Sequence, residues 1–288
     1  MAEKWFTRQF KLWLCGSMTR KSITQIIQNK GERTPLVCLT AYTAPMAQLL
    51  DPHCDVLLVG DSMAMVLYGM DSTLGADMEM MIRHGAAVVR ASTQACVVVD
   101  MPFGSYQESR EAAFRNAARL LKETGCAGVK LEGGTEMSKT VSYLAQRGIP
   151  VMGHIGLQPQ SVHTLGGYQA RGHEDSEAKK ILKDGQDIAA AGAFSIVLEG
   201  IAEPLAAAIT AAVPVPTIGI GASAACDGQI LVTEDMLGLT AGGKKPKFVK
   251  SYADLSPVME ESVKQYAQEV RRRKFPSADY VYAQRKVA

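Results

Sequence analysis

The sequence predicts an α/β fold in which eight β/α units close into a parallel (β/α)₈ TIM barrel. Compact runs rich in Val, Ile and Leu recur along the chain with little polar alternation, as in strands covered on both faces. Helical patterns separate these runs, which indicates parallel strands joined by right-handed crossovers. A length of 288 residues suits one closed barrel. No Gly-x-Gly-x-x-Gly pattern follows the first strand and no Walker loop is present, so an open nucleotide-binding sheet is disfavoured.

Seven apolar runs are predicted to be barrel strands. Each is short and dominated by aliphatic residues. They span Leu36–Tyr42, Val56–Ser62, Cys96–Phe103, Gly128–Gly134, Val151–Leu157, Phe194–Gly200 and Pro216–Ser223. The eighth strand has two candidates, Gln229–Val232 and Met236–Leu239.

Amphipathic helical patterns lie between the strands. Glycines at positions 31 and 125 stop two of them, as glycine commonly does just past a helix end. The predicted helices span Ser22–Lys30, Glu108–Thr124, Glu177–Ala191 and Glu203–Ala212. Two connections, residues 156–177 and 239–250, are long for a barrel, and long loops on compact domains commonly act as lids or interfaces.

A last helix is predicted to start at Ser256-Pro257, because a proline suits the first helical turn. Glu260 and Glu261 lie near its start and the basic run Arg271–Lys274 near its end. This polarity complements the helix dipole, so the basic run is interpreted as a solvated helix end rather than a nucleic-acid patch.

The first 18 residues are unlike the rest of the chain. They mix aromatic and basic residues, but no apolar stretch reaches the length of a signal peptide or a membrane span. A membrane-surface helix is one interpretation. A disordered or non-native leader is favoured, because Met18 opens a sensible start of its own. We therefore expect one catalytic barrel domain over residues 19–276 and a C-terminal tail over residues 277–288.

Composition excludes several functional classes. The chain has 31 Lys and Arg against 29 Asp and Glu, a net charge of +2, so no nucleic-acid partner and no membrane association are expected. The six cysteines show no CxxC or other metal-ligand spacing. Several lie within apolar runs, where a free thiol behaves as a small hydrophobe. A reducing, cytoplasmic location is therefore expected.

Ionisable side chains recur at the ends of five predicted strands. Lys130 and Glu132 lie on the same face of the predicted strand Gly128–Gly134, because alternate side chains of a strand point the same way. Considered singly, Asp61 or Asp100 would be interpreted as a cap of the following helix, and His154 as a hydrogen-bonded structural residue. Together they converge on the carboxyl end of the barrel, where barrel active sites lie. The set is Asp61, Asp100, Lys130 with Glu132, His154 and Glu199.

Several carboxylates in one barrel mouth would repel each other unless a cation lies between them. Oxygen ligands without cysteine favour Mg²⁺. Lys130 would then be a positive charge for an anionic substrate, and Glu199, from across the barrel, could act as a base. The residues alone thus predict a magnesium-dependent barrel enzyme that stabilises an enolate of a small oxo acid.

The same residues lie in an ordered set of motifs that resembles the ketopantoate hydroxymethyltransferase family. The resemblance extends from about Ser22 to about Pro276. Its motifs are VGDS at 59–62, DMPFGSY at 100–106, VKLEGG at 129–134, GHIGLQPQS at 153–161, LEG at 198–200 and IGIGAS…DGQILV at 218–232.

This resemblance implies a barrel of the phosphoenolpyruvate mutase/isocitrate lyase-like type and a specific reaction. The enolate of 3-methyl-2-oxobutanoate attacks the methylene of the co-substrate 5,10-methylenetetrahydrofolate, giving 2-dehydropantoate and tetrahydrofolate in pantothenate biosynthesis. It also implies a homodecamer.

The resemblance also assigns roles to single residues, here given by their positions in this chain. It implies Asp61, Asp100 and Glu132 as Mg²⁺ ligands and Asp61, Ser62, Asp100 and Lys130 as substrate contacts. It implies Glu199 as the proton acceptor. His154 is a further candidate, as a residue that orients a partner at the mouth.

Four residues depart from the family's usual pattern, and none is an expected ligand or base. They are Thr43, Ala64, Gly75 and Ser223. Two alternative functions remain at this stage. One is a magnesium-dependent carbon–carbon lyase of the isocitrate lyase type, although no KKCGH-like cysteine loop is present. The other is a catalytically silent barrel, which the intact charged set disfavours.

Overall fold

The computed structural model describes residues 20–240 and 245–282, so the expected leader lies outside the described residues. The chain divides into two compact units, residues 1–232 and 233–288. The single domain expected over residues 19–276 stays a prediction.

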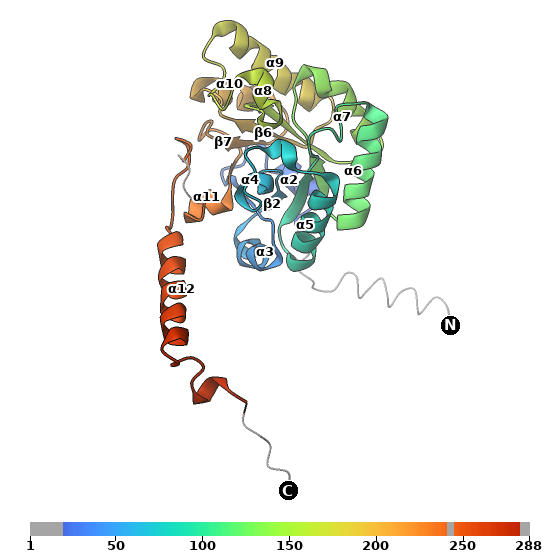
Figure 1. The fold of residues 1–288 in the computed structure, drawn as a ribbon. Helices are drawn as coiled ribbons and strands as arrows, with labels where there is room; N and C mark the ends of the chain where they lie inside the picture. The colour runs from blue at the N-terminus through green and yellow to red at the C-terminus, as the bar shows by residue number, and fades with distance from the viewer. Residues whose placement is uncertain (1–19, 241–244, 283–288) are drawn as a thin grey trace, which may run out of the picture. The chain divides into compact units, whose positions relative to one another are not determined.

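The first unit contains a closed barrel of eight parallel strands that follow one another in chain order. Helices surround the strands (Figure 1). The strands are β1 (Leu36–Thr40), β2 (Val56–Val59), β3 (Cys96–Asp100), β4 (Gly128–Lys130), β5 (Val151–Gly156), β6 (Ser195–Glu199), β7 (Thr217–Ile220) and β8 (Gly228–Leu231). The predicted barrel and all seven predicted strands are thereby confirmed.

Strand β8 settles the choice between the two candidates for the closing strand. It pairs with β1 on one side and β7 on the other, in the segment that includes Gln229. The alternative, Met236–Leu239, is wrong, because Met236 and Leu237 belong to helix α11 (Thr233–Leu237). Periodicity could not separate the two, since both are short apolar runs.

Helices of the first unit begin and end where local chemistry favours it. Ser22 forms a capping box with Gln25 at the start of α2, and Ser109 accepts a hydrogen bond from Ala112 N at the start of α6. Gly125 ends α6 in a left-handed conformation, φ 77°. The helices are α2 (Ile23–Gln28), α3 (Ala44–Leu50), α4 (Met63–Val66), α5 (Met78–Ala91), α6 (Arg110–Thr124), α7 (Ser138–Ala145), α8 (Val162–Leu165), α9 (Asp175–Ala190) and α10 (Glu203–Ala212).

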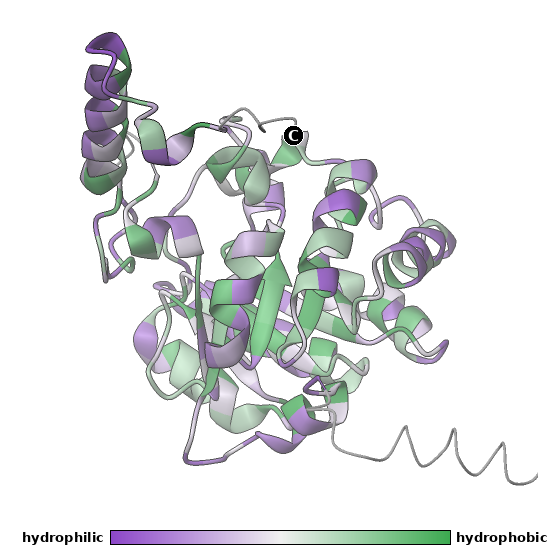
Figure 2. Cartoon of the chain, turned by 90° about the horizontal axis from the view of Figure 1, so that it is seen from below, coloured by the Kyte–Doolittle hydropathy of each residue, from purple (hydrophilic) through white to green (hydrophobic). Residues whose placement is uncertain are grey.

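Strand alternation decides which side chains reach the barrel interior. Leu57 and Val59 of β2, like Val97 and Val99 of β3, belong to the apolar core. Figure 2 shows hydrophobic residues concentrated in the strands. The side chains at the alternate positions, which include Asp100, point to the opposite face, toward the barrel interior. Charged side chains therefore reach the barrel mouth without breaking the core that packs against the helices.

The second unit is helical in its described residues. It contains α11, α12 (Ser256–Arg271) and a 3₁₀ turn at Ala278–Tyr280. Pro257 lies in the first turn of α12, as predicted, and none of the residues of α12 is buried. Over residues 20–240 and 245–282, no helix has the length and apolar character needed to cross a membrane.

Candidate active site

Asp100 and Lys130 are neighbours at the carboxyl ends of β3 and β4, where the strand register pairs them directly. Lys130 Nζ donates to Asp100 Oδ1 at 2.9 Å, and both side chains are almost fully buried. The other oxygen of Asp100, Oδ2, accepts from Asp61 N at 3.1 Å. Asp61 follows β2, so three neighbouring strand ends meet here.

Glu132 lies two residues beyond β4, because the strand is shorter than the predicted run to Gly134. Gly133 at φ 133° turns the chain there, although Gly133 N still donates to His154 O at 3.0 Å. Glu132 is only 4% exposed and its Oε2 accepts from Gln160 N at 3.0 Å. Glu132 therefore lies in the cluster that the strand pattern predicted.

His154 lies between two carboxyl groups without a close hydrogen bond to either. Its Nδ1 is 3.6 Å from Glu132 Oε1 and its Nε2 is 3.4 Å from Glu199 Oε2. Nε2 is closer to Leu157 O, at 2.8 Å, and must donate there, because a carbonyl oxygen only accepts. Burial, together with Lys130, holds the pKa of His154 well below its usual range. The ring is therefore neutral, with its proton on Nε2.

Ser62 and Glu199 complete the predicted set. Ser62 Oγ and Tyr42 Oη are 2.8 Å apart, and either hydroxyl can donate. Glu199 ends β6, and its side chain is 16% exposed against 3% for that of Glu132. Glu199 is thus the carboxylate of this cluster that a molecule entering the mouth can reach most easily.

The site holds more negative than positive charge. Burial and the neighbouring Asp100 raise the pKa of Asp61 to about 7, although Lys130 offsets part of the effect. Burial and Asp61 likewise raise the pKa of Glu132 well above its usual range. Burial alone would lower the pKa of Lys130, but the surrounding carboxylates raise it above the usual value. One lysine therefore faces several carboxyl groups that resist ionisation.

The carboxylates of Asp61, Asp100 and Glu132 can supply some, but not all, of the ligands of a Mg²⁺ ion. Their donors are carboxylate oxygens, and the raised pKa values of Asp61 and Glu132 reflect a shortage of positive charge. In the described part of the chain, no three His, Cys, Asp or Glu side chains are grouped so as to hold a metal ion. A cation bound here would keep water ligands or take substrate oxygens, as Mg²⁺ commonly does.

Two residues of the site, Gln160 and Tyr106, were not expected from the sequence. Gln160 Nε2 donates to Asp61 Oδ2 at 2.8 Å, and Tyr106 Oη donates to Gln160 Oε1 at 2.6 Å. Both lie in motifs of the resemblance, GHIGLQPQS and DMPFGSY, but neither is ionised at neutral pH, so a search for charged strand ends passes over them.

The four departures from the family pattern lie outside this cluster and have local roles. Thr43 caps α3 through a hydrogen bond from Met46 N at 3.4 Å, and Ala64 is buried in α4. Ser223 Oγ donates to Glu203 Oε1 at 2.7 Å. A Cβ at Gly75 would meet Met70 Sδ at 2.4 Å, so a larger residue would require Met70 to move.

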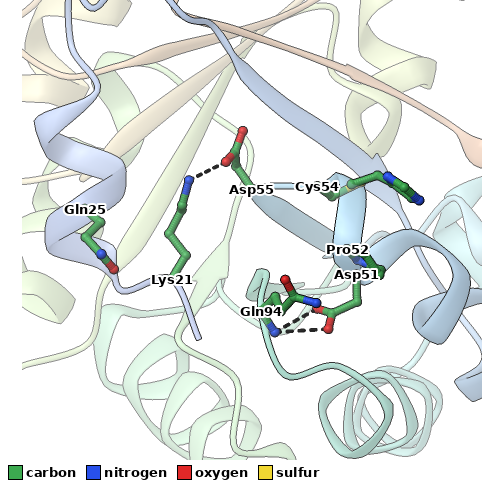
Figure 3. A pocket seen from close by; sticks show the side chains of 8 residues that line it. Lys21, Gln25, Asp51, Pro52, Cys54, Asp55 and Gln94 are labelled. Carbon is green, nitrogen blue, oxygen red and sulfur yellow. Dashed lines mark hydrogen bonds and ion pairs between the residues drawn. The ribbon is translucent and has the colours of Figure 1, made fainter. Parts of the chain in front are cut away.

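A pocket of about 420 Å³ lies at the opposite end of the barrel, lined by residues that precede β2 and β3 (Figure 3). Its carboxylates are already satisfied. Asp51 accepts from the backbone N–H groups of residues 93–95, and Asp55 pairs with Lys21. These contacts join the segments that precede β2 and β3, and they are structural rather than catalytic, since catalytic groups lie at the carboxyl ends of barrel strands.

Two solved enzyme structures share the fold of this chain. Phosphonopyruvate hydrolase, in complex with oxalate and Mg²⁺, gives a TM-score of 0.57 at 11% identity, covering 92% of this chain and 93% of that one. 2,3-Dimethylmalate lyase, a phosphoenolpyruvate mutase/isocitrate lyase superfamily member, gives 0.55 at 14% identity, covering 89% and 88%. The predicted barrel type is thereby confirmed.

Sequence comparison identifies the family. The family model described as ketopantoate hydroxymethyltransferase matches residues 20–278. The 3-methyl-2-oxobutanoate hydroxymethyltransferase of Rhodospirillum centenum is 62% identical over 273 residues, covering 95% of this chain and 98% of the relative. This similarity confirms the resemblance and favours hydroxymethyl transfer over the lyase and silent-barrel alternatives. The chain is an enzyme of the hydroxymethyltransferase class and belongs to the ketopantoate hydroxymethyltransferase family.

Proposed function

We propose that Glu199 is the base that starts the family's reaction, at a Mg²⁺ site made by Asp61, Asp100 and Glu132. The observation that carries this proposal is where the four carboxylates lie in the buried cluster. Asp61, Asp100 and Glu132 lie at the ends of β2, β3 and β4 beside Lys130, whereas Glu199 ends β6, on the other side of His154 from Glu132, and has the most exposed side chain of the four. A set of ligands and a separate base need this arrangement.

The metal site rests on charge and donor type. Bound Mg²⁺ supplies a positive charge that stabilises negative charge developing on the keto oxygen of the substrate. The relevance of Mg²⁺ to this fold is supported by phosphonopyruvate hydrolase, which has been solved with oxalate and Mg²⁺. Oxalate is a dianion with adjacent carboxylates, and an oxo acid offers a similar pair of oxygens.

Asp61, Ser62, Asp100 and Lys130 are proposed to contact the substrate, 3-methyl-2-oxobutanoate. Lys130 is held as a cation by the carboxylates around it, which raise its pKa. It can therefore attract the carboxylate of the oxo acid and add to the field at the reacting centre. Ser62 Oγ is within hydrogen-bond distance of Tyr42 Oη and can donate to a substrate oxygen when the tyrosine donates to it.

Glu199 is suited to removing the proton from C3 of the oxo acid. Burial is the main cause that raises its pKa to about 7, with Asp61 and Asp100 adding to the effect and Lys130 opposing it. A base works best when its pKa lies near the working pH, and a placed general base contributes roughly 10²–10⁴-fold. The enolate then forms a carbon–carbon bond to the methylene of 5,10-methylenetetrahydrofolate. Water supplies the hydroxyl group as the bonds from this carbon to the folate nitrogens break, so the products are 2-dehydropantoate and tetrahydrofolate.

His154 is proposed to orient these groups rather than to transfer the proton. Its neutral ring donates to Leu157 O and lies between Glu132 and Glu199. Nδ1 has no hydrogen-bond partner among the described residues, so it can accept from a donor that enters the site. The homodecamer implied by the resemblance and the cytoplasmic location expected from the cysteines stay predictions.

Metal removal tests the proposal. Activity with 5,10-methylenetetrahydrofolate should disappear in chelator and return with added MgCl₂. The substitution Glu132→Gln should weaken Mg²⁺ and oxo-acid binding together, whereas Glu199→Gln should keep both and lose turnover. Full activity of a metal-stripped preparation would contradict the proposed metal site.

A further inference from the structure

Gln160 is a neutral residue held at the centre of the charged cluster. It lies in a 3₁₀ turn, Pro159–Ser161, that follows β5, and it is 4% exposed. Such burial of an amide is costly unless each polar atom has a partner. In Gln160, the amide nitrogen and the amide oxygen each have two hydrogen-bond partners.

The hydrogen bonds determine which way the amide points. Nε2 donates to Met101 O at 3.0 Å, and a carbonyl oxygen can only accept, so this end must be the NH₂ group. The second hydrogen goes to Asp61 Oδ2 at 2.8 Å. Oε1 accepts from Tyr106 Oη at 2.6 Å and from Gln107 Nε2 at 3.2 Å. All four hydrogen-bonding positions of the amide are thus used, and rotation about its last bond would break the set.

Gln160 contacts two of the proposed ligands with different atoms. Its side chain donates to Asp61, and its backbone N–H donates to Glu132 Oε2 at 3.0 Å. Tyr106 Oη closes the connection, because it accepts from Glu132 N at 3.1 Å while donating to Gln160. Asp61 follows β2 and Glu132 follows β4, and the two hydrogen bonds of Gln160 link them directly.

We propose that Gln160 is a positioning residue that holds the carboxylates of Asp61 and Glu132 in the arrangement that binds Mg²⁺. This inference rests on the proposed metal site. Buried carboxylates repel each other and would turn apart or take up protons in the absence of a cation. A donor shared by both opposes that movement before the metal arrives.

A neutral amide suits this role better than a charged side chain would. Lys130 already pairs with Asp100, and a second cation beside Asp61 would neutralise the charge that attracts the metal. A carboxylate at position 160 would add repulsion and could not donate without a proton. An amide donates a hydrogen bond while leaving the negative charge of Asp61 in place.

The test is calorimetric titration of MgCl₂ into chelator-treated, dialysed enzyme. Replacing residues that orient metal ligands typically weakens metal affinity about 10–100-fold. We expect a loss in this range for Gln160→Met, which keeps length but cannot donate, and for Gln160→Glu. Tyr106→Phe, which frees the amide oxygen, should show a smaller loss. The matched control is Gln158→Met, two residues earlier in the same loop, where the glutamine side chain makes no hydrogen bond among the described residues.

A second readout separates positioning from a general loss of packing. The rise in unfolding midpoint on adding MgCl₂ should shrink in Gln160→Met, while a purely structural residue would lower the midpoint equally with and without the metal. High MgCl₂ should restore much of the turnover of Gln160→Met. If Gln160→Met does not fold, Gln160→Glu and Tyr106→Phe carry the same comparison.

The outcomes are distinct. Mg²⁺ affinity within about two-fold of the native enzyme, in folded Gln160→Met and Gln160→Glu, would overturn the role of Gln160 while leaving the metal site intact. Failure of the native enzyme to bind Mg²⁺, or unchanged binding in Asp61→Asn, would overturn the metal site and the role of Gln160 with it.

Discussion

Glu199→Gln should make the enzyme more stable at alkaline pH while it removes activity. Burial is the largest of the causes that raise the pKa of Glu199 from 4.5 to about 7. A carboxyl group with a raised folded-state pKa opposes folding above that pKa, because ionisation is harder in the folded chain than in the unfolded one. Below the unfolded pKa both states carry the proton and the cost vanishes.

The size of the effect follows from the shift. At about 1.36 kcal/mol per pKa unit, the difference between 4.5 and about 7 corresponds to roughly 3 kcal/mol. The side chain is 16% exposed, so solvent screening reduces this only in part. Glutamine keeps the shape and carries no charge. The free energy of unfolding of Glu199→Gln should therefore exceed that of the native enzyme by up to roughly 3 kcal/mol at pH 8, and by about 1 kcal/mol or less at pH 5.

Urea unfolding at the two pH values measures this difference, at one protein concentration and in chelator so that metal binding does not contribute. Glu108→Gln, an exposed position before α6, is the matched control and should show no such difference. Equal or lower stability of Glu199→Gln at pH 8 would refute the reasoning, since it would mean that the folded enzyme ionises Glu199 without cost.

Two further predictions concern buried charges. At pH 7, Asp51→Asn should cost roughly 1.5–3 kcal/mol of unfolding free energy, the worth of hydrogen bonds to a charged group. Burial alone would raise the pKa of Asp51, but backbone hydrogen bonds from Ala95, Thr93 and Gln94 lower it. The stabilisation is thus present above the unfolded pKa of 3.8 and is lost as the pH falls through the folded value, so urea unfolding should show the cost of Asp51→Asn shrinking in acid. Lys130→Met should cost roughly 3–5 kcal/mol and weaken oxo-acid binding, because it leaves Asp100 buried without its cation. Exposed Lys139→Met is its control in both unfolding and binding assays, and equal behaviour of the two variants would contradict the importance of the buried pair.

The fold was predictable because each strand carries its own signal. Runs such as Val56–Val59 are buried over their whole length, and the helical patterns between them leave parallel pairing as the simplest solution. The closing strand was ambiguous, since Gln229 and Met236 both lie in short apolar segments whose difference is tertiary.

The charged part of the site was predictable for a related reason. An ionised residue at the end of an apolar strand is costly to bury, so its presence at Asp100 or Lys130 signals a use. The polar links were not predictable from single residues. A glutamine such as Gln160 is common in loops, and only the assembled structure reveals that its amide joins Asp61 to Tyr106. The early end of β4 at Lys130, which leaves Glu132 beyond the strand, is likewise visible only in the structure.

Exchange of the C3 proton of 3-methyl-2-oxobutanoate with deuterated water, in the presence of MgCl₂ and without folate, tests most directly whether Glu199 is the base. Proton NMR follows the loss of the C3 signal. The native enzyme should exchange this proton clearly, and Glu199→Gln should do so at least about 10²-fold more slowly while still binding the oxo acid. Glu132→Gln should lose exchange together with binding. Exchange at the native rate in Glu199→Gln would contradict the account, because another group would then remove the proton.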